Sequence, residues 1–240
     1  MLRSIEIAVQ FLTVFKVRLD PVPDMSDVGK SAWAFPVVGA LIGAVLVGTY
    51  LVLAGHLPLV LVAVVVVGLW VILTGGLHLD GWTDCWDALA ASVSQERRFE
   101  ILKDSRLGTF GALALILLLA AKIGAIAQEG FPIIMLFLAP VLGRGIMVLS
   151  AHKVRHQGEG MGARFLSQID ERAVKWAAII GLVPAILAGW TGIWAAAGGY
   201  LGAMCFRRFA ESRLGAVNGD VIGAICELTE ALVLLIACLR

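Results

Sequence analysis

The sequence predicts an all-α, polytopic integral membrane bundle of about seven transmembrane helices with an amphipathic N-terminal helix, as a single domain over residues 1–240. Composition supports this class, because 60% of the residues are hydrophobic and 15% are charged, whereas soluble domains carry about 25% charge. The mean hydropathy of +0.91 agrees. Long apolar segments also recur at close to the roughly 20 residues that a spanning helix needs.

The elements follow in order along the chain. Residues 1–15 mix apolar and polar side chains, which indicates an amphipathic surface helix and not a cleaved signal. Seven apolar segments come next, and as one helix residues 174–206 would measure about 50 Å, too long for a hydrocarbon core of about 30 Å, so a hairpin is favoured there. The candidate spans are Trp33–Ala54, Leu59–Leu77, Phe110–Ala127, Phe131–Ala151, Ala177–Ala188, Ile193–Phe206 and Val221–Leu239.

Charge patterning predicts the orientation. Most of the 19 basic residues lie in the first segment and in loops 78–109, 152–176 and 207–220, while the alternate connections hold none. The positive-inside rule then places the N-terminus and these loops on the cytoplasmic side of a bacterial-type inner membrane. A net charge of +1 predicts no nucleic-acid partner. Glu129 is the one acid in a predicted outer loop, which favours an enzyme site on one face over a transport path.

The first candidate site follows the second span, at His78 to Asp87. On a helix, Asp80, Asp84 and Asp87 fall at i, i+4 and i+7, within about 60° of one another. Such carboxylates repel unless a cation or hydrogen-bond donors compensate them, and hard oxygen ligands suit Mg²⁺. The alternative is a solvated acidic face, although Trp82 and its neighbours make the rest of the segment apolar.

The second candidate is the loop that enters the third span. Lys103 and Arg106 could neutralise phosphates, and Asp104 could complete a metal site. The alternative is ordinary positive-inside flanking of a helix start. That alternative explains the basic residues well and explains Asp104 less well.

Charged residues within the spans are functional candidates by default. Arg144 could meet a substrate phosphate or pair with an acid, and a snorkelling or ion-paired Arg is the alternative. Lys122, near the outer end of its span, is expected to snorkel.

The last span adds further acids. Asp220 and Glu227 share one helix face, preceded by Asn218, and buried carboxylates need partners such as Arg144 or a shared metal. An ion-paired packing role is equally open for Glu230.

Several motifs together resemble the cobalamin synthase family, the adenosylcobinamide-GDP ribazoletransferases. They comprise Thr74-Gly-Gly-Leu-His-Leu-Asp-Gly-Trp-Thr-Asp-Cys-Trp-Asp87, the Lys-Asp-Ser-Arg block within residues 98–111, and Gly219-Asp-x-x-Gly-Ala-x-x-Glu227. The resemblance runs in collinear order from residue 11 to about 230. Two departures are Ala88, where the family has Gly, and Asn218, which replaces a hydroxyl and leaves its own role open.

The resemblance implies a membrane-bound, Mg²⁺-dependent transferase that completes nucleotide-loop assembly in cobalamin biosynthesis. It would join adenosylcobinamide-GDP to α-ribazole or its 5′-phosphate and release GMP. The expected roles fall into three groups. They are catalysis by Asp84 and Asp80; Mg²⁺ binding by Asp80, Asp84, Asp87 and Asp104; and substrate binding by His78, Lys103, Arg106, Arg144, Asn218, Asp220 and Glu227.

Three other functions compete with a cobalamin synthase for this sequence. A CDP-alcohol phosphotransferase would need an aspartate motif of different spacing, which the chain lacks. A cation transporter would place carboxylates toward both sides, and a structural scaffold leaves the aspartates unexplained. The small-xxx-small glycine patterns allow close helix packing and also a homo-oligomer. Association with other cobalamin-assembly enzymes stays open.

Overall fold

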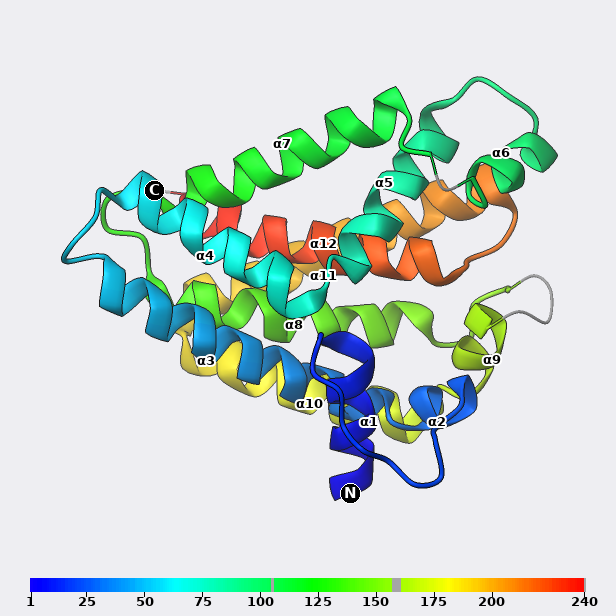
Figure 1. The fold of residues 1–240 in the computed structure, drawn as a ribbon, viewed down its shortest axis with the longest axis horizontal. Coiled ribbons are helices and arrows are strands. Elements are labelled where there is room, and N and C mark those ends of the chain that lie inside the picture. The colour runs from blue at the N-terminus through cyan, green and yellow to red at the C-terminus, as the bar shows by residue number, and fades with distance from the viewer. Residues whose placement is uncertain (105, 157–160, 240) are drawn as a thin grey trace.

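The computed structural model describes residues 1–104, 106–156 and 161–239, and every regular element within them is a helix. Most of the long helices pack side by side with their axes roughly aligned (Figure 1). This arrangement confirms the predicted all-α class. The elements are α1 (Leu2–Leu12), α2 (Met25–Lys30), η1 (Ala32–Ala34, a 3-10 helix), α3 (Phe35–Leu53), α4 (Leu59–Thr74), α5 (Leu77–Ala90), α6 (Gln95–Ile101), α7 (Thr109–Ile126), α8 (Ile133–Ala151), α9 (Met161–Ser167), α10 (Glu171–Leu187), α11 (Gly189–Leu214) and α12 (Gly219–Ile236).

The predicted count of seven spans is not confirmed, although a long helix covers each predicted apolar segment. Three described helical segments are long and apolar enough to cross a membrane, and the bent pair α4 and α5 would make a fourth. α10 falls short with 17 residues, and α12 carries Asp220 and two glutamates. The three segments are Ala32–Leu53, Thr109–Ile126 and Ile133–Ala151.

Helices α10 and α11 form the hairpin predicted within residues 174–206. α10 ends at Leu187 and α11 begins at Gly189, whose left-handed φ of 73° reverses the chain. A Cβ placed at Gly192 would overlap the carbonyl oxygen of Ala185, so the two helices approach closely just after the turn. The break at the turn prevents one overlong helix.

The segments predicted to carry the positive charge lie together at one end of the bundle. In Figure 1, α2, α6, α9 and the turn between α11 and α12 are at the right-hand end. The α3–α4 and α7–α8 connections and the C-terminus are at the left-hand end. The polar segments therefore share one end of the bundle. The side of the membrane on which this end lies stays a prediction.

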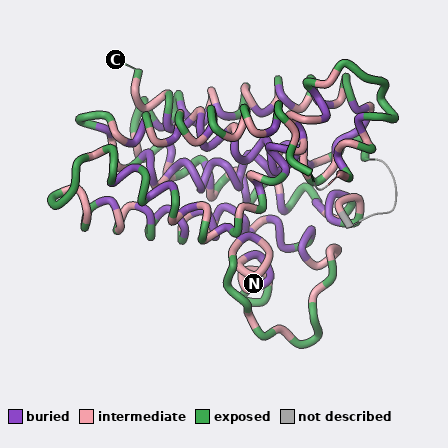
Figure 2. The backbone as a smooth tube through the Cα atoms, turned by 45° about the horizontal axis from the view of Figure 1, so that its top comes forward, coloured by how far each residue is buried: buried purple, intermediate pink, exposed green. Residues whose placement is uncertain are grey.

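Helix α8 is the centre of the bundle, because most of its residues are buried. Figure 2 shows buried residues concentrated through the middle of the bundle and exposed residues along the connections. A Cβ at Gly39 of α3 would overlap the Pro140 carbonyl group of α8, and one at Gly43 would lie 2.6 Å from the Phe137 oxygen. This small-residue pattern is therefore used within the chain to bring α3 against α8.

Helix α1 buries Ile7, Ala8 and Leu12 and crosses the aligned helices at a steep angle (Figure 1). These buried residues fit the amphipathic helix predicted for the N-terminus. The segment after α1 then runs to the end of α4, where the Val14 amide donates a hydrogen bond of 2.9 Å to the Leu73 carbonyl oxygen. The N-terminal segment thus lies beside the joint between α4 and α5.

Candidate functional site

The site is created by a sharp bend between α4 and α5. Gly75 and Gly76 adopt left-handed φ angles of 62° and 70°, a conformation that favours glycine. The two helix axes consequently differ in direction by 93°. The two helices qualify as a span only as a pair. Because α4 is apolar up to Thr74 and α5 carries three aspartates, we treat α4 as the membrane-spanning limb of this pair and α5 as the limb outside the hydrocarbon core. The bend places the predicted aspartates beside the neighbouring helices.

Three carboxylates lie near enough to repel one another where α5 packs against α12, and we call Asp80, Asp84 and Asp220 the acidic edge. Asp80 and Asp84 are one turn apart on α5, as predicted, and Asp220 lies in the first turn of α12. The crossing is close because a Cβ at Gly81 would lie 2.8 Å from the Asp220 carbonyl oxygen. Asp80 is exposed, and the other two are half-buried.

The electrostatics of the acidic edge are unfavourable for three charges. Burial, followed by the charges of Asp80, Asp220 and Asp87, raises the pKa of Asp84 from 3.8 to about 6. Negative charges around a carboxylate disfavour its ionised form unless a bound cation compensates them. The acidic edge is therefore a place where an added cation would be stabilised.

Asp87 shares the helix face of Asp80 and Asp84 but has donors of its own. Its two carboxylate oxygens accept hydrogen bonds of 2.7 Å and 2.8 Å from the amides of Gly108 and Gly111. A Cβ at either glycine would overlap this carboxylate, and one at Gly111 would also lie 2.7 Å from the Thr83 carbonyl oxygen. Asp87 thus fastens the start of α7 to α5, and its oxygens face amides instead of the acidic edge.

The segment between α6 and α7 carries the predicted phosphate-binding residues. Lys103 and Arg106 are exposed, and Asp104 accepts hydrogen bonds from the Arg106 guanidinium at 2.6 Å and 3.0 Å. These bonds lower the pKa of Asp104 to about 2. The structure therefore pairs Asp104 with Arg106 and does not bring it to the other aspartates.

An opening of about 730 Å³ lies directly beside the acidic edge. Asp80 and Asp84 are the only charged side chains among the described residues that line it. Apolar side chains of α7 and the N-terminal segment face them, including Leu115, Leu119 and Val14. The opening thus joins a carboxylate wall to an apolar wall.

The donor set fits a cation that completes its coordination elsewhere. Among the described residues, no three His, Cys, Asp or Glu side chains form a metal-holding group, so the predicted set of four carboxylates is not assembled. Mg²⁺ in proteins is commonly held by one or two carboxylates, with water and substrate phosphates as its other ligands. The acidic edge offers carboxylates for that mode of binding.

Asn218 and His78 support the crossing of α5 and α12. Asn218 caps α12 by accepting a hydrogen bond of 3.0 Å from the Val221 amide, and its own amide donates one of 2.7 Å to the Asp220 carboxylate. His78 is buried with Nδ1 lacking a hydrogen-bond partner among the described residues. Its Cα would lie 3.5 Å from a Cβ at Gly223. Asn218 therefore positions Asp220, and His78 lies where α5 passes close to Gly223 of α12.

A second charged group lies deep in the bundle, and we call Lys122, Arg144, Glu227 and Glu230 the buried ion cluster. The Lys122 ammonium donates to Glu227 at 2.6 Å and to Glu230 at 2.5 Å. Arg144, fully buried, forms an ion pair with Glu230.

This cluster corrects one expectation and resolves others. Lys122 is 4% exposed and lies 4.4 Å from the centre of the Trp70 ring, so the prediction that it snorkels was wrong. Arg144 pairs with Glu230, and Glu227 pairs with Lys122. The ion-paired role left open for Glu230 is therefore the one observed. The cluster ties α12 to α7 and α8.

Two structural residues escaped the sequence analysis. Arg98 is buried and donates hydrogen bonds to the carbonyl oxygens of Ala88 and Leu89, which caps the end of α5. Gln95 donates at 2.7 Å to the Leu214 carbonyl oxygen at the end of α11. Positive-inside flanking fully explained Arg98 in the sequence, so no signal there indicated a cap.

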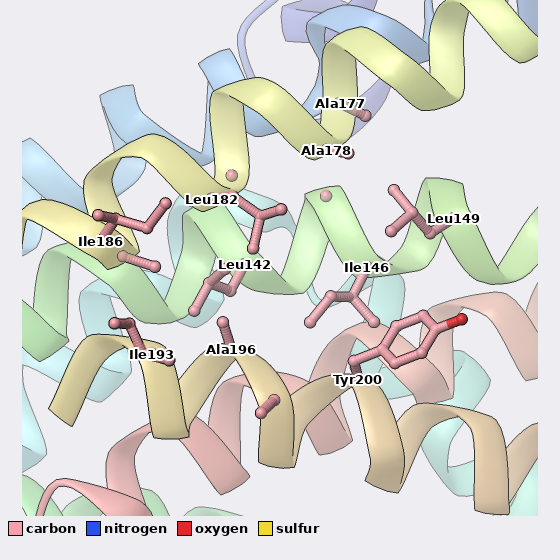
Figure 3. A pocket seen from close by; sticks show the side chains of 14 residues that line it. Leu142, Ile146, Leu149, Ala177, Ala178, Leu182, Ile186, Ile193, Ala196 and Tyr200 are labelled. Atoms are coloured by element: carbon pink, nitrogen blue, oxygen red, sulfur yellow. The ribbon is translucent and has the colours of Figure 1, made fainter. Parts of the chain in front are cut away.

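A separate cavity of about 600 Å³ lies between α8, α10 and α11 (Figure 3). Its labelled side chains are aliphatic except Tyr200, whose ring faces the cavity beside Ile146. Among the described lining residues, Tyr200 is the only titratable one. This apolar cavity lacks the groups that phosphate chemistry requires, so the acidic edge is the candidate reaction site.

Comparison with known proteins agrees with the motifs. A family model described as cobalamin-5-phosphate synthase matches residues 4–238. An adenosylcobinamide-GDP ribazoletransferase of Pseudomonas syringae pv. syringae (strain B728a) is 40% identical over 239 residues, which cover 95% of this chain and 96% of the relative. One from Alkaliphilus metalliredigens (strain QYMF) is 34% identical over 229 residues, covering 94% and 91%. No solved structure matches the chain. The protein therefore belongs to the cobalamin-5-phosphate synthase family.

Proposed function

We propose that this membrane protein joins adenosylcobinamide-GDP to α-ribazole or α-ribazole 5′-phosphate, forming adenosylcobalamin or its 5′-phosphate and GMP. The observation that carries the proposal is the acidic edge beside an opening, on a chain whose relatives are named adenosylcobinamide-GDP ribazoletransferases. A ribose hydroxyl attacks the phosphorus that bears the corrinoid arm. The phosphoanhydride bond to GMP breaks, and the hydroxyl proton passes to a base.

Mg²⁺ is part of the proposal, with the acidic edge as its site. When bound, it would neutralise the charge that develops on the phosphate oxygens. Asp80 and Asp220 would hold the ion, and the phosphates of the substrate would complete its ligands. Asp87 and Asp104 are left out of the expected metal set, because both oxygens of each carboxylate accept hydrogen bonds from the protein. Among the described residues, only one oxygen of Asp220 has such a donor, the amide of Asn218.

Asp84 is our candidate for the base that accepts the hydroxyl proton. Burial is the largest cause of the raised pKa of Asp84, which is about 6 in the metal-free protein, and a buried carboxylate of raised pKa is better able to take up a proton near neutral pH. It is half-buried and borders the opening, so a substrate hydroxyl can approach it. Asn218 positions the neighbouring Asp220 through the hydrogen bond between their side chains.

The rest of the opening suits the remaining parts of the substrates. Lys103 and Arg106, exposed on the segment between α6 and α7, would neutralise the pyrophosphate and the departing GMP. The apolar wall formed by Leu115 and Leu119 would face the large corrinoid. Arg144, expected from the sequence to bind substrate, is assigned instead to the buried ion cluster.

The rival functions fit this geometry less well. A cation transporter needs acids along a path through the membrane, and the two buried glutamates are already paired with Lys122 and Arg144. The sequence lacks the aspartate motif that a CDP-alcohol phosphotransferase would need. We also propose the cytoplasmic membrane, with the polar end of the bundle facing the cytoplasm, because that end carries most of the basic residues.

The test is an assay of the purified protein in liposomes with adenosylcobinamide-GDP, each form of ribazole and Mg²⁺, following GMP and corrinoid product. We expect Asp84→Asn to lower kcat by about 10²- to 10⁴-fold, and EDTA to abolish product. Asp20→Asn is the matched control, since it makes the same change on an exposed loop. A folded wild-type protein that makes no product with either ribazole would refute the proposed reaction.

A further inference from the structure

A separate hollow of about 510 Å³ lies on the outside of the bundle, where α1, α2, η1 and α10 meet. Its lining includes the basic residues Lys30 and Arg172 and the aromatic residues Trp33 and Trp176. It shares no residue with the opening beside the acidic edge. α2 and the start of α10 both lie at the polar end of the bundle (Figure 1).

The side of α10 that lines the hollow changes in polarity along the helix. Arg172, Trp176 and Ile180 line it at intervals of four residues, which places each about 6 Å further along the axis. The order is cationic, then aromatic, then aliphatic. Tryptophan favours the headgroup level of a bilayer, and Trp176 is 47% exposed. The same order of chemistry runs from the phosphate to the acyl chains of a phospholipid.

The two cations have charge available for a ligand. Among residues 1–104, 106–156 and 161–239, no carboxylate lies within ion-pairing distance of Lys30 or Arg172. Asp170 also lines the hollow, but its carboxylate accepts a hydrogen bond of 2.7 Å from the Ala173 amide as the cap of α10. Lys30 lies in the last turn of α2 and lines the hollow from a different helix than Arg172.

We propose that this hollow binds the headgroup of an anionic phospholipid, with Lys30 and Arg172 at the phosphate and Trp33 and Trp176 at the glycerol level. The acyl chains would continue along the lipid-facing side of α10, where Ile179 and Val183 are each 49% exposed. Basic pockets between helices at the polar surface are a recognised way of holding anionic lipids. The bound lipid would fasten α1 and α2 to α10.

The test measures lipid affinity directly, by native mass spectrometry of the detergent-purified full chain titrated with dioleoyl-phosphatidylglycerol or dioleoyl-phosphatidylcholine. We expect the wild type to prefer phosphatidylglycerol by about 25-fold, which corresponds to two basic residues at about 1 kcal/mol each. Each basic residue should contribute about fivefold, so Lys30→Gln with Arg172→Gln should weaken phosphatidylglycerol binding by about 25-fold. Phosphatidylcholine binding should change little.

The matched control is Lys16→Gln with Arg18→Gln, which removes the same charge from the exposed N-terminal loop. We expect less than a twofold change, and inorganic phosphate should not displace the lipid. Equal losses in both double variants would show that only the general surface charge matters, and would overturn the proposal. Equal wild-type affinity for the two lipids, or displacement by inorganic phosphate, would overturn it as well. Thermal midpoints without added lipid check that all variants are folded.

Discussion

The acidic edge and the buried ion cluster both contain carboxylates of α12, but in opposite surroundings. In the cluster, Glu227 and Glu230 face Lys122 and Arg144, and all four are almost fully buried. At the acidic edge, Asp220 lies near Asp80 and Asp84, two further aspartates that border an opening. One helix therefore carries a charge-balanced group in the core and an unbalanced group at the bundle end.

The difference separates structural from chemical roles. Removing one partner from a buried pair leaves an uncompensated charge, so such pairs are fixed parts of the fold. Like charges at a partly exposed position lower stability and are retained where a ligand uses them. The cluster fixes α12 against α7 and α8, and α12 in turn presents Asp220 to α5. The buried ion cluster thus holds in place the helix that brings Asp220 to the acidic edge.

Lys122→Met should have the largest effect on stability, because it leaves Glu227 and Glu230 short of a cation in the core. We expect the free energy of unfolding in detergent to fall by about 3 to 5 kcal/mol. Lys153→Met is the matched control, since Lys153 pairs with Glu171 on the surface, and it should change stability little. Equal losses in the two variants would show that burial of the cluster has no special importance.

Asp87→Ala should have an intermediate effect and would sharpen the comparison within one helix. It leaves the amides of Gly108 and Gly111 without their acceptor, at a cost of about 2 kcal/mol. Asp80→Ala, on the same helix face, removes no such bond and should not destabilise. Asp87→Asn should recover part of the loss, measured by thermal unfolding. Greater destabilisation by Asp80→Ala would contradict this assignment.

Asp84→Asn should have the smallest effect and the opposite sign. The pKa of Asp84 is raised from 3.8 to about 6 in the fold, so the folded state binds more protons across that interval and loses stability as pH rises through it. At pH 7, without Mg²⁺, the variant should be more stable than the wild type by about 1 kcal/mol after solvent screening. The gain should shrink as the pH falls from 6 toward 4. A gain that does not depend on pH would contradict the charge explanation.

Features governed by local pattern were predictable from the sequence. Helical periodicity placed Asp80, Asp84 and Asp87 on one face, and the length limit of a span indicated a break within residues 174–206, expected at 189–192 and found between Leu187 and Gly189. The uneven distribution of Lys and Arg predicted that the polar segments share one end of the bundle. These three predictions depend only on residues close together in the chain or on overall composition.

Contacts between helices were not predictable in the same way. Periodicity tells which side of its own helix a residue occupies but not which neighbour it meets. Lys122 and Glu227 are 105 residues apart, and their pairing depends on how α7 and α12 cross. The same limit explains Asp87, since the sequence indicated that its charge needed compensation but not that backbone amides would provide it.

The two glycines between α4 and α5 determine where the aspartates of α5 lie relative to the rest of the bundle. A continuous helix from Leu59 to Ala90 would be about 48 Å long, well beyond a hydrocarbon core of about 30 Å. Its aspartates would then project into bulk water, away from α12. The bend of 93° instead keeps them beside α12 and at one side of an opening whose other lining residues are mostly apolar.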